Sequence, residues 1–169
     1  MHNHDIFVRE PIQMLKAIGK WLDKAEAYAA EKKFNAEDLL AARLVPDQYS
    51  LTRQIQSACD SAKSNAARLS GTELPSHPDT EKTVSELRAR LEKTIAFLET
   101  ITPAAFDGAD ERKITQSWMG GKHVLGVDYA RQFAVPNFHF HVVTTYAILR
   151  HNGVPLGKMD FVTELNLQG

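Results

Sequence analysis

The chain lacks the features that mark several large classes of protein. It has one cysteine, Cys59, among 169 residues, so an internal disulfide is impossible and a reducing, cytoplasmic location is expected. Its 20 Lys and Arg residues nearly balance its 21 Asp and Glu residues, whereas a nucleic-acid binder would normally carry a basic excess. No apolar run approaches the ~20 residues that span a bilayer, and the opening residues MHNHDIFVREP lack the apolar centre of a signal peptide. We therefore predict a soluble, cytoplasmic protein that binds neither nucleic acid nor membrane.

Four segments carry apolar residues every three or four positions, which is the spacing of one helix face. We expect helices over 6–33, from Asp47 or Ser50 to Leu69, from a cap at Asp79 or Thr80 to Ile101, and over 137–153. A shorter helical turn is expected over 36–43. Pro136 either starts the last helix or kinks a longer one that includes an earlier turn near Tyr129. Glycine and proline residues follow the predicted ends: Gly71, Pro75, Pro103, Gly153 and Pro155.

A different pattern precedes the last helix. In KITQSWMGGKHVLG, the residues Ile114, Gln116 and Trp118 alternate before the Gly120-Gly121 pair, and Val124 follows, which is typical of a β-hairpin. We expect the aromatic residues around the hairpin and last helix to be chiefly core: Trp118, Tyr129, Phe133, Phe138 and Phe140. The sequence thus predicts one all-α domain over 1–169, a four-helix bundle with a small β-hairpin before the last helix.

The last helix resembles the terminal helix of the DinB/YfiT-like superfamily of helical bundles. In HVVTTYAILRHNGVP, His141 is followed nine positions later by Arg150 and then by the turn at Gly153. Three further stretches resemble an uncharacterised, domain-of-unknown-function branch of that superfamily: LLAARLVPDQYSLTRQIQSACDSAKSNAARLSG, PNFHFH and AILRHNGVPLGK. The resemblance runs from Phe7 to Phe161. It implies a four-helix bundle and a homodimer.

The resemblance also implies a divalent metal, since members often bind one through three histidines. One of these histidines lies on the second helix, and two lie four residues apart on the last. His141 takes the second position of that pair, but Asn137 takes the first. The predicted second helix has no histidine, and Gln54 and Gln56 lie near the place of the missing ligand. Only one of the two glutamines is expected to point inward.

Two other side chains could complete a site. Asp60 lies one helical turn beyond Gln56. His139 lies two residues from His141, about 200° away around a regular helix, so the two histidines could face one metal only if Pro136 made the local backbone irregular. A set of Asn137, His141 and Gln56 would bind a transition metal poorly, because amides are weak ligands for it.

Two hypotheses follow for a pocket that would be formed by Gln56, Asp60, Asn137, His139 and His141. The first is a binding or structural protein with an incomplete metal triad and a small-molecule ligand near His141, which would be a hydrogen-bonded pocket histidine. The second is a metal- or thiol-dependent transferase-like enzyme, in which His141 is a metal ligand or a general base. Cys59 is expected to be an inert core residue.

Overall fold

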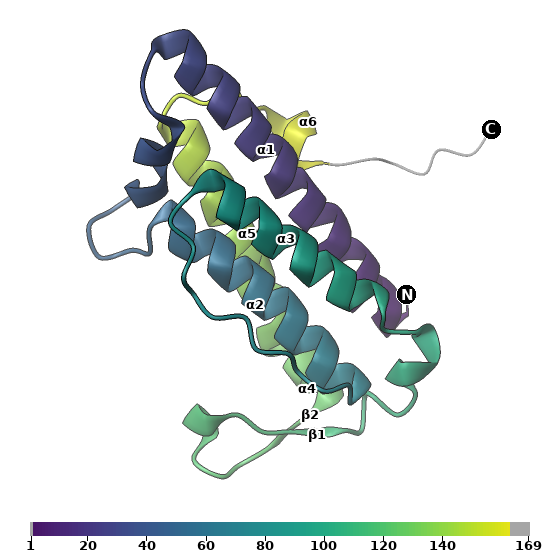
Figure 1. Cartoon of the computed structure of the whole chain (residues 1–169). Helices are drawn as coiled ribbons and strands as arrows, with labels where there is room; N and C mark the ends of the chain where they lie inside the picture. The colour runs from purple at the N-terminus through teal and green to yellow at the C-terminus, as the bar shows by residue number, and fades with distance from the viewer. Residues whose placement is uncertain (1, 163–169) are drawn as a thin grey trace, which may run out of the picture.

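The computed structural model describes residues 2–162 and shows four long helices packed side by side, with a small hairpin at one end (Figure 1). This is the predicted all-α bundle. Residues 1 and 163–169 of the predicted domain lie outside the described residues. Within residues 2–162, no helix is both long enough and apolar enough to cross a membrane.

The elements follow one another in this order. The long helices are α1 (Glu10–Lys32), α2 (Leu51–Ser70), α3 (Val84–Glu99) and α5 (Val135–His151); the short ones are α4 (Gly126–Tyr129) and α6 (Lys158–Phe161). Single π-helical turns cover Asp5–Arg9 and Ala130–Ala134, and 3-10 turns cover Ala36–Ala41, Pro103–Phe106 and Ser117–Met119. Strands β1 (Lys113–Ile114) and β2 (Val124–Leu125) pair antiparallel, with Lys113 opposite Leu125.

The third helix begins later than predicted. The expected cap at Asp79 or Thr80 is wrong, because α3 starts at Val84 with a capping box. The side chain of Thr83 accepts a hydrogen bond from the Glu86 N–H at 3.1 Å, and the Glu86 carboxylate accepts one from the Thr83 N–H at 3.0 Å. Residues 71–83, which we call the crossover segment, therefore run as extended chain alongside the bundle (Figure 1).

The last helix is the longer of the two alternatives. α4, a π-helical turn and α5 are continuous from Gly126 to His151, and Pro136 lies in the first turn of α5. Proline has no N–H to donate to the preceding turn, so a local change of helical register is expected near it. The π turn makes that change directly before Pro136, where the Val135 N–H bonds the Ala130 carbonyl.

The aromatic predictions are partly confirmed. Tyr129 and Phe138 are buried, but Trp118 is 62% exposed and Phe140 is 53% exposed, so the expectation that these two belong to the core is wrong. The strands are only two residues long and stop before Gln116, which leaves Trp118 in a 3-10 turn at the tip of the hairpin. Phe140 lies on the outward face of α5.

Candidate functional site

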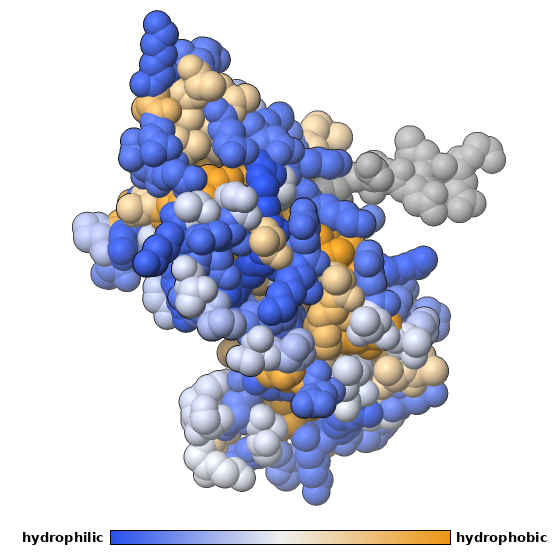
Figure 2. Space-filling view, viewed as in Figure 1, coloured by the Kyte–Doolittle hydropathy of each residue, from blue (hydrophilic) through white to orange (hydrophobic). Residues whose placement is uncertain are grey.

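A cleft of about 620 Å³ opens where α2, α5, the crossover segment and the approach to the hairpin meet. The surface is indented between the hairpin and the body of the bundle (Figure 2). The cleft is mainly polar. Its lining includes three basic residues, one carboxylate, two histidines and four serines: Arg53, Lys63, Arg68; Asp60; His77, His141; Ser57, Ser61, Ser64, Ser76.

One face of α2 supplies most of these side chains. Five of them recur at intervals of three or four residues, so they form a polar stripe along one side of the helix: Arg53, Ser57, Ser61, Ser64 and Arg68. This stripe is readable in the sequence, although the prediction missed it by concentrating on Gln54, Gln56 and Asp60. The opposite face of α2 carries Leu51, Ile55 and Ala62 into the core.

His141 is held at the edge of the cleft by a glutamine of the facing helix. Its Nδ1 lies 2.8 Å from Oε1 of Gln54. An amide oxygen only accepts hydrogen bonds, so Nδ1 carries the proton and Nε2 keeps its lone pair. Burial, together with the charge of Arg53, lowers the pKa of His141 below its ordinary value. The imidazole is therefore neutral at pH 7. Nε2 is its basic nitrogen, and the bond to Gln54 fixes the orientation of the ring.

Asn137 is engaged in a second polar chain between the same helices. Its side-chain amide donates to Ser61 Oγ at 3.0 Å. Asn65 also donates to Ser61 Oγ at 3.1 Å and to the Ala134 carbonyl at 3.0 Å, and its own oxygen accepts from the Tyr129 hydroxyl at 2.8 Å. These bonds fix the start of α5 against α2 and leave the Ser61 hydroxyl hydrogen free to donate.

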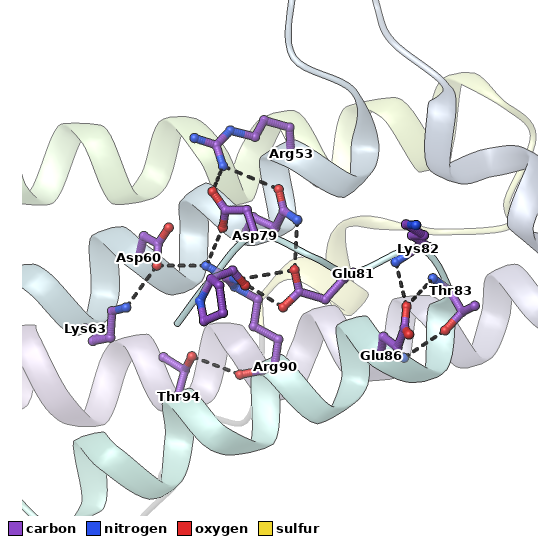
Figure 3. A network of polar contacts seen from close by, with 12 residues as sticks. Arg53, Asp60, Lys63, Asp79, Glu81, Lys82, Thr83, Glu86, Arg90 and Thr94 are labelled. Atoms are coloured by element: carbon purple, nitrogen blue, oxygen red, sulfur yellow. Dashed lines mark hydrogen bonds and ion pairs between the residues drawn. The ribbon is translucent and has the colours of Figure 1, made fainter. Parts of the chain in front are cut away.

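Behind the cleft wall, a buried arginine ties the crossover segment to the helices (Figure 3). Arg90 contacts Asp60 at 2.8 Å, Asp79 at 2.9 Å and Glu81 at 3.0 Å, with its side chain 1% exposed. Asp79 also pairs with Arg53. Burial by itself would raise the pKa of Glu81, but hydrogen bonds from Arg90 and Gln56 outweigh it and hold the pKa below its ordinary value. The wall of the cleft is thus fixed by a charged network.

The structure brings three of the five candidate residues to the cleft: Asp60, Asn137 and His141. Gln56 does not line it. Gln54 and Gln56 are both buried, contrary to expectation, because the crossover segment covers the second side of α2 and Gln56 bonds Glu81 there at 2.8 Å. His139 points to α1, where its Nε2 lies 3.0 Å from the Glu10 carboxylate. It therefore does not share a site with His141.

The donor set at the cleft does not fit a transition metal. His141 offers one imidazole nitrogen, the Asp60 carboxylate is held by Lys63 and Arg90, and Asn137 bonds Ser61. Within residues 2–162, no three His, Cys, Asp or Glu side chains are grouped so as to hold a metal ion. Zinc and similar ions bind imidazole, thiolate or carboxylate ligands far better than amides and hydroxyls.

Cys59 supplies no thiolate. It is fully buried, and burial raises its pKa to about 12. The expectation that Cys59 is a core residue is confirmed, and a raised pKa fits the expected low reactivity.

Comparison with known proteins identifies the family of this chain. A family model described as Domain of unknown function (DUF1993) matches residues 4–162. The chain belongs to the DUF1993 family. This DUF1993 protein is similar to a DinB family member protein from Shewanella denitrificans, whose crystal structure superposes with a TM-score of 0.95. The two sequences are 41% identical, and the match covers 98% of this chain and 94% of that one. The predicted resemblance to a DinB-like family of unknown function is confirmed. No curated protein matches the chain.

Proposed function

We propose that this DUF1993 protein is a small-molecule-binding member of the DinB-like bundles that works without a three-histidine metal centre. One observation carries the proposal: the two positions on α5 where the superfamily would place metal ligands form hydrogen bonds to α2 at the cleft. Gln54 binds His141 and Ser61 binds Asn137. The bond to Ser61 occupies the Asn137 amide, and the bond to Gln54 leaves His141 with one free nitrogen, Nε2, as a single imidazole ligand in a pre-formed polar cleft.

The alternative is a thiol-dependent transferase-like enzyme that uses His141 as a general base. Its support is the fixed Nδ1–H bond to Gln54, since a base whose ring is oriented by a third group is the usual arrangement for proton transfer. Nε2 would take the proton of a low-molecular-weight thiol, and the thiolate would displace a leaving group from a second substrate. A metal-dependent version lacks support because the donor set does not fit a metal.

The first measurement is elemental analysis of the protein after incubation with zinc, nickel and manganese. We expect far less than one metal per chain in the wild type, in His141→Ala and in His151→Ala. His151 is the matched control because it is an exposed histidine on the same helix. Near-stoichiometric metal that is lost only in His141→Ala would overturn the proposal.

Native mass spectrometry then distinguishes the small-molecule-binding protein from the thiol-dependent enzyme. A small molecule retained by the wild type and lost when Ser61→Leu fills the cleft supports binding. Release of a covalently altered thiol product, dependent on His141, supports the enzyme instead.

A further inference from the structure

We infer that the cleft takes the oxyanion of its ligand, a phosphoryl or carboxylate group, on Lys63 and Arg68. This inference rests on the proposed function, because it names the class of small molecule that the cleft would bind. It depends on how the charges are distributed across the cleft wall.

The wall separates the positive from the negative side chains. Arg53, Lys63 and Arg68 line the cleft, whereas Asp79 and Glu81 do not. Asp60 is the one carboxylate in the lining, and its Oδ1 is bound by Arg90 at 2.8 Å and by Lys63 at 3.1 Å. Arg90 lies outside the lining, and its contact with Asp60 compensates the charge of that carboxylate (Figure 3). The surface that a ligand meets is therefore positive.

Two of the three cations have capacity left for a ligand. Lys63 is 6% exposed, and its ammonium has three donors, of which Asp60 takes one. Within residues 2–162, Arg68 forms no ion pair with a carboxylate; its polar contact is the Tyr129 hydroxyl. Arg53 is compensated by Asp79. A buried ammonium and a guanidinium on one wall suit an oxyanion, which accepts several charge-assisted hydrogen bonds.

Neutral groups around these cations add further donors. His77 is nine-tenths buried in the lining, and its Nδ1 has no hydrogen-bond partner within the described chain. Ser61 accepts two bonds and retains its own hydrogen for donation. Burial and the neighbouring charge of Lys63 lower the pKa of His77, so the ring is neutral at pH 7 with one N–H to donate. An oxyanion in the cleft would accept the Ser61 hydrogen, and the His77 ring in the lining would sense its charge.

The test follows the imidazole NMR signals of His77 and His141 during titration. The probes are inorganic phosphate and succinate, with sodium chloride at matched ionic strength and the neutral polyol erythritol as references. We expect saturable shifts with phosphate or succinate, and the tighter of the two identifies the group. Lys63→Met and Arg68→Gln should each weaken that binding by about tenfold, the usual effect of losing one charge-assisted hydrogen bond. Arg131→Gln is the control, since Arg131 is a 73% exposed arginine outside the lining, and it should change nothing.

The outcomes are separable. Shifts that chloride reproduces would overturn the inference, as would anion binding that survives both cleft variants when circular dichroism shows them folded. Saturable binding of erythritol, or retention of a neutral molecule by the purified protein, without anion binding would overturn the ligand class and leave the proposed function standing. No binding of any probe, together with no molecule retained on purification, would reject both.

Discussion

Arg90 keeps its charge inside the protein, surrounded by Asp60, Asp79 and Glu81. Removing one partner of a buried ion pair leaves uncompensated charge, so we expect Arg90→Met to lower the free energy of unfolding by about 3–5 kcal/mol. Arg88→Met is the matched control on the same helix, because Arg88 is 27% exposed and pairs with the more exposed Asp23 and Glu26. It should cost about 1 kcal/mol or less. Urea denaturation measures both, and equal losses would contradict the prediction.

His139 and His141 should titrate on opposite sides of the ordinary histidine pKa of 6.5. The hydrogen bond to Glu10 raises the pKa of His139, whereas burial lowers that of His141. NMR titration of the two rings measures the order. A raised folded-state pKa stabilises the fold fully below the unfolded pKa, and that stabilisation is lost as pH rises through the folded value.

A variant of the partner carboxylate tests the sign. Glu10→Gln should therefore destabilise the protein at pH 5 more than at pH 9. The effect should be small, because both side chains are partly exposed. A loss that grows with pH would contradict this assignment.

At the scale of elements, two glycines should respond to alanine in opposite directions. A Cβ on Gly126, at the start of α4, would overlap the Ala109 carbonyl, so Gly126→Ala should cost about 1–3 kcal/mol through overpacking. Gly19, inside α1, has nothing within 4 Å of such an atom. Gly19→Ala should stabilise the protein by about 0.5–1 kcal/mol through helix propensity. Thermal unfolding measures both, and shifts of the same sign would contradict the packing described here.

The helices were predictable because each buries one face, and that face is periodic in the sequence. The start of α3 was missed although its signal is local: Thr83 and Glu86 have the spacing of a capping box, while Asp79 and Thr80 satisfy only the weaker preference for a capping residue. The strands were overextended because alternation at Gln116 and Trp118 continues into a turn.

The candidate site was predictable only in part. Asn137 and His141 share a face by their spacing, and the stripe on α2 could have been found in the same way. The position of His77 could not, because it depends on the path of the crossover segment. The same path explains why Gln54 and Gln56 are both buried.

At the scale of the whole molecule, the homodimer remains a prediction, and the structure suggests a surface on which to test it. The outward face of α5 carries Phe140 and Val143, 53% and 48% exposed and three residues apart. We expect two copies to pair through this face, since two-fold pairing is the commonest assembly and buries such residues. Phe140→Glu combined with Val143→Glu should give a monomer by light scattering, whereas Met159→Glu, on the 72% exposed residue of α6, should not. A monomeric wild type would contradict the prediction.

The two sides of the cleft come from distant parts of the chain. Gln54 and His141 are 87 residues apart, and Ser61 and Asn137 are 76 apart. No single hairpin of helices contains the site, so it exists only when the first and last halves of the bundle are docked. Some amide hydrogens exchange only when the whole chain unfolds, whereas others exchange when helix ends fray. A ligand in the cleft would therefore slow exchange of the first group and leave exchange of the second group unchanged.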